Sequence, residues 1–239
     1  MSRTVFDLPH TEAILIERLR LVATVLRYAN TTMRAATLLD VGCGVGNASR
    51  RITQDYGLRV TGVDLRAENV VEAKIRSTQE EYIAHDLERP CGPDCPLAGR
   101  TFDVTLCLGL LYHLENPFAA VRHIARHTGQ ILIVESRVSP GGTPHARLSQ
   151  EGPGVDQSGA GLALVPSSSA LCVMLASCGF KGLYEPTAYA TKHKDFVLRH
   201  GWRERIVLVA SRAPISAASG LGLVPRSSSA TPVHAIWGK

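Results

Sequence analysis

The sequence contains no run of about 18 apolar residues, the length that a membrane-spanning helix requires, and no membrane partner is expected. Residues 1–7 lack the apolar segment of a secretory signal, so the expected compartment is the cytoplasm. The chain also lacks long blocks of like charge: its 26 Lys and Arg residues are spread along the sequence, although the net charge is +5. The composition thus permits nucleic-acid binding without indicating it.

A second cysteine pair at zinc-finger spacing is absent as well. Of the 6 cysteines, Cys91 and Cys95 lie close together in a segment that also contains Gly and Pro. This pair could bind a metal ion, but a single pair is weak evidence for a metal site. Because reduced thiols are expected in a chain without a secretory signal, we predict a loop with two free thiols and no metal.

A regular alternation of strand-like and helix-like segments runs through most of the chain. With 239 residues, of which 45% are hydrophobic, the chain can form one sizeable α/β core. Apolar runs predict strands at residues 37–41, 58–64, 81–85, 102–108, 130–135, 181–188 and 205–211. Helical periodicity between these runs predicts a doubly wound, mostly parallel sheet with helices on both faces.

Other segments fall outside this alternation or sit at its margins. Residues 1–35 are predicted to form an N-terminal helical lid ahead of a domain that spans residues 36–212. Residues 139–161 are rich in Gly, Pro, Ser and Gln and predict a loop insertion. Residues 213–239 have no amphipathic pattern and predict a flexible tail. The basic residues between 191 and 203 are interpreted as a solvated connection, with a contact to nucleic acid as the alternative.

A glycine-rich turn follows the first predicted strand. Gly42, Gly44 and Gly46 alternate with other residues between the apolar run that ends at Val41 and a predicted helix. Without Cβ atoms the backbone at these positions can take positive φ angles and approach a ligand closely. The pattern predicts a nucleotide-binding turn, although a tight turn that binds nothing would need the same glycines.

Acidic residues stand at the ends of three successive predicted strands, namely Asp40, Asp64 and Asp86. Asp64 follows Gly42 by 22 residues, the spacing at which a carboxylate at the tip of the second strand can accept hydrogen bonds from ribose hydroxyls. In doubly wound folds, ligands bind at the carboxyl ends of the strands. We therefore expect these three carboxylates at one ligand-binding edge of the sheet.

Four motifs in this order resemble the class I S-adenosylmethionine-dependent methyltransferases: Leu39-Asp-Val-Gly-Cys-Gly-Val-Gly46, Val60-Thr-Gly-Val-Asp64, His85-Asp-Leu87 and Phe102-Asp-Val104. The resemblance covers residues 37–136. NAD-binding folds normally read Gly-x-Gly-x-x-Gly and have no Asp two residues before the first glycine. The resemblance implies a Rossmann-like, seven-stranded sheet and S-adenosyl-L-methionine as the cofactor.

The resemblance also implies a role for each matched position. The three glycines would accommodate the methionine part and the adenosine, and Asp40 would lie near the amino-acid end of the cofactor. Asp64 would bind the ribose hydroxyls, and Asp86 would accept from the adenine amino group. The remaining implied pocket residues are apolar or sulfur-containing: Leu65 packing on adenine, Leu87 beside Asp86, and Cys107 and Leu108 at the end of the fourth strand.

A finer resemblance starts at Leu106 and runs to Pro117, through Leu-Tyr112-His113-Leu. It looks like the subgroup that is related to tRNA wobble-uridine methyltransferases and to natural-product O-methyltransferases. Methyl transfer to a hydroxyl needs a base, and histidine has a suitable pKa. We therefore predict His113 as the base with Tyr112 beside it; the alternative is that both only form the pocket wall. Glu135 is a weaker candidate base, with a buried salt bridge or a helix cap as the favoured interpretation.

Three functional hypotheses remain from the sequence. The leading one is O-methylation of a small hydroxylated metabolite. The second is a tRNA-modifying methyltransferase acting at a wobble-type uridine, favoured by the Leu-Tyr-His resemblance and by the basic residues between 191 and 203. The third is an NAD-linked or non-catalytic nucleotide-binding domain.

Overall fold

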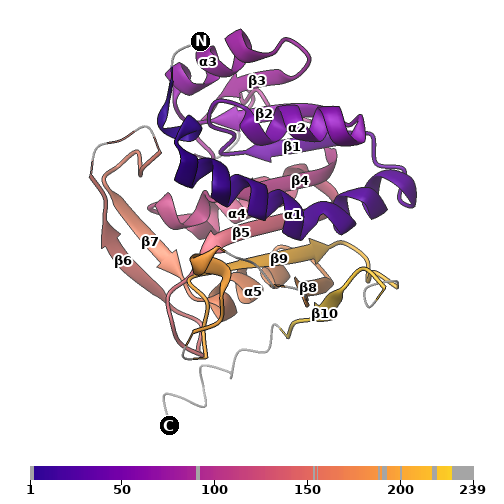
Figure 1. The fold of residues 1–239 in the computed structure, drawn as a ribbon, viewed down its shortest axis with the longest axis vertical. Helices are drawn as coiled ribbons and strands as arrows, with labels where there is room; N and C mark the ends of the chain where they lie inside the picture. Colours follow the sequence, from indigo (N-terminus) through magenta and orange to yellow (C-terminus); the bar gives the residue numbers. More distant parts are fainter. Residues whose placement is uncertain are drawn as a thin grey trace.

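The computed structural model describes residues 3–89, 92–152, 154, 156–187, 189, 193–199, 201–216 and 220–227 (Figure 1). Eight strands form the main sheet: β1 (Thr37–Val41), β2 (Arg59–Asp64), β3 (Glu81–Ala84), β4 (Phe102–Leu108), β5 (Thr128–Arg137), β8 (Gly182–Pro186), β9 (Arg205–Ser211) and β10 (Leu223–Pro225). The α-helices are α1 (Pro9–Thr31), α2 (Asn47–Tyr56), α3 (Ala67–Arg76), α4 (Pro117–His127) and α5 (Ser168–Ser177). Short 3-10 turns are η1 (Val5–Asp7), η2 (Leu111–His113) and η3 (Lys194–Phe196).

The strand order in the main sheet is β10-β8-β9-β5-β4-β1-β2-β3. The five strands from β5 to β3 are mutually parallel, whereas β9, β8 and β10 pair antiparallel. The chain crosses outward from β1 to β3 and then returns to β4 on the other side of β1. This reversal confirms the predicted doubly wound fold, and it puts a ligand-binding crevice at the carboxyl ends of β1 and β4.

Helices cover both faces of the sheet, as Figure 1 shows for α1 and α2 in front of the strands and α4 and α5 behind them. Alternate residues of β1 belong to different cores: Leu38 packs with α1 and α2, and Leu39 packs with α4 and α5. Successive side chains of a strand point to opposite faces, so a strand buried on both sides is apolar almost throughout. This explains the continuous apolar runs from which the strands were predicted.

The structure corrects the predictions for two segments that were expected to lack strands. Within residues 139–161, which were predicted to be a loop, the strand β6 (Ala146–Gln150) pairs antiparallel with β7 (Leu162–Pro166), so the segment is a hairpin and not an irregular loop. The strand β6 was not predicted because its residues are largely exposed and show little apolar periodicity. Within the predicted tail, Leu223–Pro225 forms β10, because Leu223 is buried against the sheet edge. Residues 217–219 and 228–239 lie outside the described residues.

Among the described residues, no helix combines the length and the apolar character needed to cross a bilayer. The predicted free thiols are wrong for Cys95, which is disulfide-bonded in a tight turn where its N–H donates to the Gly92 carbonyl. Cys91 lies outside the described residues.

Candidate functional site

A cavity of about 360 Å³ lies at the carboxyl ends of β1 to β4, where the fold predicts a ligand. The lining comes from the ends of these strands, from η1 and α1, from η2 and from the end of the β6–β7 hairpin. Nine of the predicted site residues line it: Asp40, Gly42, Asp64, Leu65, Asp86, Leu87, Leu108, Tyr112 and His113. The sequence-predicted residues thus converge from segments that are spread along the sequence between residues 40 and 113.

The glycine turn has the predicted backbone. Gly42, Gly44 and Gly46 have φ angles of 71°, 53° and 75°, in the left-handed region that favours glycine. A Cβ on Gly44 would lie 2.8 Å from the Phe6 ring, and a Cβ on Gly46 would collide with the Tyr82 hydroxyl. Gly42 lines the cavity directly, whereas the other two glycines shape the turn and admit its neighbours.

We expect Gly46→Ala to destabilise the protein by more than Gly57→Ala. The two glycines stand at opposite ends of α2 with similar φ angles of 75° and 67°, but a Cβ on Gly57 meets nothing within 4 Å. Left-handed strain costs each variant about 1–2 kcal/mol. The Tyr82 clash adds a further loss of about 1–3 kcal/mol to Gly46→Ala alone. Urea unfolding of both variants measures this difference, and equal losses would show that the turn tolerates the added methyl group.

Asp64 holds the glycine turn and faces the cavity. Its carboxylate accepts hydrogen bonds from the Gly44 N–H at 2.9 Å, the Arg66 N–H at 3.0 Å and the Asn69 side-chain amide at 3.1 Å. A carboxylate offers about four lone-pair positions, so at least one acceptor position remains for a ligand hydroxyl. The position is therefore compatible with a ribose contact.

Asp40 is only 2% exposed, although it lines the cavity. Burial raises the pKa of this carboxyl to about 6, while a hydrogen bond from the Ser49 hydroxyl at 2.6 Å opposes the rise. A positively charged ligand group nearby would stabilise its ionised form. Arg18 of α1 also lines the cavity, and its positive charge opposes the rise in the Asp40 pKa; sequence reasoning missed this residue.

The third strand-end carboxylate, Asp86, accepts hydrogen bonds from the Glu88 N–H at 3.0 Å and from Arg89 Nε at 3.1 Å. Leu65, at the end of β2, is an apolar side chain that remains 48% exposed at the cavity. An exposed apolar surface beside a carboxylate suits a planar heterocycle with a polar edge. These residues form the outer end of the cavity together with Leu87.

Cys107 does not line the cavity as predicted. It is fully buried in the core on the α4 and α5 face, whereas its neighbour Leu108 reaches the cavity. Consecutive residues of a strand point to opposite faces, so the two cannot share one pocket wall. Burial raises the pKa of the Cys107 thiol far above its usual range, so this thiol stays protonated.

The N-terminal segment, which was predicted to be a lid, lines one side of the cavity. The Phe6 ring packs on Gly44, and the Phe6 carbonyl accepts a hydrogen bond from the Asn47 side chain at 3.1 Å. Asp7 forms an ion pair with Arg76 of α3 at 2.7 Å, and this arginine holds the pKa of the Asp7 carboxyl well below its usual range. The N-terminal segment is therefore fastened to both α2 and α3.

His113 is paired with a carboxylate that the sequence analysis missed. Its Nδ1 lies 2.7 Å from Oε2 of Glu151, the first residue after β6, and Glu151 also accepts from the Ser158 N–H at 2.7 Å. An ionised carboxylate only accepts hydrogen bonds, so Nδ1 carries the proton and Nε2 keeps its lone pair. Burial lowers the pKa of His113, and the Glu151 carboxylate opposes this effect. A neutral, oriented imidazole results, which is suited to accept a proton.

Tyr112 is held by a buried ionic cluster. Its hydroxyl accepts a hydrogen bond from Arg205 Nη2 at 3.0 Å, and Arg205 Nη1 contacts Glu135 at 2.9 Å. Glu135 is 0% exposed and forms a second ion pair with Arg18 at 2.6 Å. Of the two roles favoured from the sequence, this arrangement confirms the buried salt bridge. The partners Arg18 and Arg205 left no local signal, since they lie far from Glu135 in the sequence.

Comparisons with known proteins agree with this geometry. Residues 39–130 match the family described as "Methyltransferase domain". The norajmaline N-methyltransferase of Rauvolfia serpentina is 28% identical over 114 residues, which are 45% of this chain and 38% of that protein. A ubiquinone biosynthesis O-methyltransferase of Xanthomonas campestris is 31% identical over 122 residues, 48% of this chain and 44% of that protein. The chain thus matches about two fifths of the length of these curated relatives.

Solved structures share the fold over most of the chain. The N-terminal domain of EvdMO1 with SAH bound superposes with a TM-score of 0.61 at 21% identity, covering 82% of this chain and 80% of that one. The [4+2]-cyclase SpnF superposes with a TM-score of 0.55 at 21% identity and 82% coverage of both chains. Residues 39–130 therefore match a methyltransferase domain by sequence, and over most of its length the chain shares the fold of a solved domain with SAH bound.

Proposed function

We propose that this protein binds S-adenosylmethionine in the cavity and transfers its methyl group to an oxygen atom of a small hydroxylated molecule. The observation that carries the proposal is the cavity itself. The glycine turn and the three strand-end carboxylates line this cavity. His113 of η2, whose ring is paired with the Glu151 carboxylate, lines it as well. The relatives named above carry names of small-molecule O- and N-methyltransferases, which supports a small acceptor.

The proposed cofactor site divides into a nucleoside end and an amino-acid end. Asp64 would bind the ribose hydroxyls, Leu65 would pack on the adenine, and Asp86 would accept from the adenine amino group. At the other end, Asp40 would face the ammonium group of the methionine part, whose positive charge would stabilise the ionised form of this buried carboxylate. Arg18 would face the carboxylate of the methionine part while its Nε remains paired with Glu135.

The cofactor supplies an activated methyl group on a sulfonium, and the protein must align the acceptor and remove a proton. We propose that His113 Nε2 accepts the proton of the acceptor hydroxyl as the oxygen attacks the methyl carbon. The bond from methyl carbon to oxygen forms as the bond from methyl carbon to sulfur breaks, and His113 ends as an imidazolium. Glu151 stabilises that cation through Nδ1.

A tRNA acceptor is the second hypothesis, and the basic residues between 191 and 203 favoured it in the sequence. Arg203 stacks on the Tyr189 ring at 4.2 Å and lies 3.7 Å from Glu185, so its charge is used within the protein. Lys194 and Arg199 are exposed, and Lys192 and His200 lie outside the described residues. We keep the small-molecule acceptor as the proposal, because the relatives named above carry names of small-molecule methyltransferases.

Asp64→Ala should weaken S-adenosylmethionine binding by about 10- to 150-fold, because it removes charge-assisted hydrogen bonds worth about 1.5–3 kcal/mol. Asp103→Ala is the matched control. Asp103 also accepts backbone N–H groups, from Ala36 at 2.8 Å and Thr37 at 3.0 Å, but it lies at the opposite end of β4. Isothermal titration of both variants checks the assignment, and an unchanged dissociation constant for Asp64→Ala would contradict the ribose contact.

The proposed chemistry is tested by incubating the protein and S-adenosylmethionine with panels of phenols, sugars and other small hydroxylated metabolites, and separately with total tRNA. Mass spectrometry then detects the gain of one methyl group. Methylation of a small hydroxylated molecule is the expected result. Methylation of tRNA alone would replace the proposal with the second hypothesis.

A further inference from the structure

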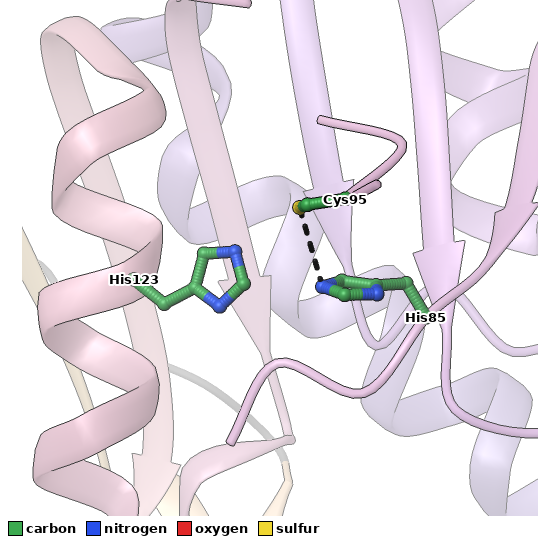
Figure 2. A group of neighbouring side chains, drawn as sticks. All are labelled: His85, Cys95 and His123. Carbon is green, nitrogen blue, oxygen red and sulfur yellow. Dashed lines mark hydrogen bonds between the residues drawn. The ribbon is translucent and has the colours of Figure 1, made fainter. Parts of the chain in front are cut away.

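Three potential metal ligands meet beside the outer end of the cavity, in a place that the proposed function does not use. His85 directly follows β3, Cys95 lies in the loop between β3 and β4, and His123 is on α4 (Figure 2). His85 Nε2 is 3.6 Å from the Cys95 sulfur, and one ligand atom from each of the three residues lies within 4.8 Å of the others. Side chains from three separate segments therefore converge on one point.

His123 is already oriented as a metal ligand would be. Its Nδ1 lies 3.1 Å from the Leu87 carbonyl and 3.0 Å from the Arg89 carbonyl, and carbonyls only accept hydrogen bonds. Nδ1 therefore carries the proton, and Nε2 keeps a lone pair. This Nε2 is buried without a hydrogen-bond partner and faces Cys95 and His85 in Figure 2. Metal-binding histidines typically donate their other ring N–H to a carbonyl or carboxylate in this way.

The orphaned nitrogen of His123 also has an energetic consequence, since no hydrogen bond satisfies its buried Nε2. An unpaired buried acceptor costs free energy, and a bound cation would remove that cost at His123 Nε2.

The sulfur is the part of the cluster that changes with redox state. Cys95 is disulfide-bonded in this structure, and a disulfide sulfur is not the thiolate that transition metals bind. Reduction of the disulfide takes two electrons and two protons and yields two thiols. Coordination of the Cys95 thiol then releases its proton.

We propose that reduction of the Cys95 disulfide turns His85, Cys95 and His123 into a binding site for a divalent transition metal, with Zn²⁺ as the ion that fits this donor set. Zinc is bound by thiolate and imidazole at distances of about 2.3 and 2.0–2.1 Å, so tetrahedral ligand atoms lie about 3.4–3.6 Å apart. The His85 to Cys95 separation of 3.6 Å already matches this geometry. The other separations need an inward movement of about 1 Å. Water or another donor would complete the tetrahedron.

The metal would also fix one wall of the cavity. His85 lines the cavity together with the adjacent Asp86 and Leu87, and His123 binds the Leu87 carbonyl. A metal held between these residues would anchor the segment that follows β3 to α4. Metal binding itself does not depend on the proposed methyl transfer, so the two proposals can fail separately.

The test uses the full chain without an affinity tag, because a polyhistidine tag would bind metal. One sample is reduced with a phosphine, which takes up oxygen from water as it cleaves the disulfide, and a second sample stays oxidised. Both are incubated with Zn²⁺, desalted and analysed by plasma mass spectrometry. We expect about one zinc ion per chain in the reduced sample and none in the oxidised sample. Co²⁺ in place of Zn²⁺ should give tetrahedral visible bands and a thiolate-to-cobalt charge-transfer band.

Variants locate the site. His123→Asn keeps a donor for the two carbonyls but removes Nε2. His123→Asn and Cys95→Ser, each as a single variant, should lower the zinc affinity at least about 100-fold in a chelator competition. His127→Asn is the matched control. His127 resembles His123 in two ways: its Nδ1 donates to a carbonyl, that of Arg100 at 2.8 Å, and its buried Nε2 has no hydrogen-bond partner. His127 does not belong to the cluster of His85, Cys95 and His123.

The control variant should retain the metal. The proposal is overturned if the reduced wild-type chain holds no more zinc than Cys95→Ser, or if His127→Asn loses as much affinity as His123→Asn. Absence of the charge-transfer band in the reduced cobalt-treated wild type would also overturn it, independently of how the variants fold.

Discussion

Replacement of His113 by asparagine is expected to slow methyl transfer by about 10²–10⁴-fold, the usual contribution of a positioned general base. Asparagine can still donate to Glu151 from a position close to that of Nδ1, but it has no counterpart of Nε2. The affinity for S-adenosylmethionine should remain nearly unchanged, because the proposed cofactor contacts come from β1, β2 and β3. Single-turnover rates and calorimetric titrations separate these two effects. Turnover that persists at the wild-type rate would mean that His113 only forms the pocket wall.

The pH dependence gives a second readout of the same pair. Burial lowers the pKa of His113, so the neutral base should persist below its ordinary pKa of about 6.5, and kcat/KM should fall only below that pH. Glu151 raises the pKa of His113, so Glu151→Gln should shift the acid limb of the profile to still lower pH. A shift toward higher pH would contradict the assigned direction of this interaction.

Arg205→Met is expected to lower the free energy of unfolding by about 3–5 kcal/mol, the typical loss when one partner of a buried ion pair is removed. The variant leaves the fully buried Glu135 with Arg18 alone and removes the hydrogen bond to the Tyr112 hydroxyl. Both effects add to the loss. Chemical denaturation at fixed pH measures it.

Arg137→Met is the control for that loss, since Arg137 contacts Glu204 at 3.4 Å with both side chains about half exposed. Exposed pairs contribute at most about 1 kcal/mol, so this variant should unfold almost as the wild type does. Equal losses for the two arginine variants would show that the cluster around Glu135 has no special weight in stability.

The parts of the site that could be predicted from the sequence are those set by local chemistry. Gly42, Gly44 and Gly46 take the positive φ angles that their spacing indicates, since no other residue adopts this turn without strain. Asp40, Asp64 and Asp86 meet at the cavity because parallel strands end at one edge of the sheet. Both features depend on the order of strands and helices, which apolar periodicity reveals well.

The parts that could not be predicted are contacts between distant segments. Glu151 reaches His113 only because β6 and β7 form a hairpin, and β6 is too exposed to show an apolar pattern. Arg18 and Arg205 pair with Glu135 because α1 and β9 pack against β5. Both arginines lie far from Glu135 in the sequence, so no local motif indicates either ion pair. Cys107 was wrongly assigned to the cavity because the prediction located the end of the strand but did not say to which face of the sheet each side chain points.

The [4+2]-cyclase SpnF has the same architecture as this chain, so binding of S-adenosylmethionine in the cavity is the property to measure first. Isothermal titration of the unmodified chain with S-adenosylmethionine, and in parallel with NAD, measures it. We expect saturable binding of S-adenosylmethionine to one site per chain and no binding of NAD. Micromolar binding of NAD with no heat from S-adenosylmethionine would contradict this expectation.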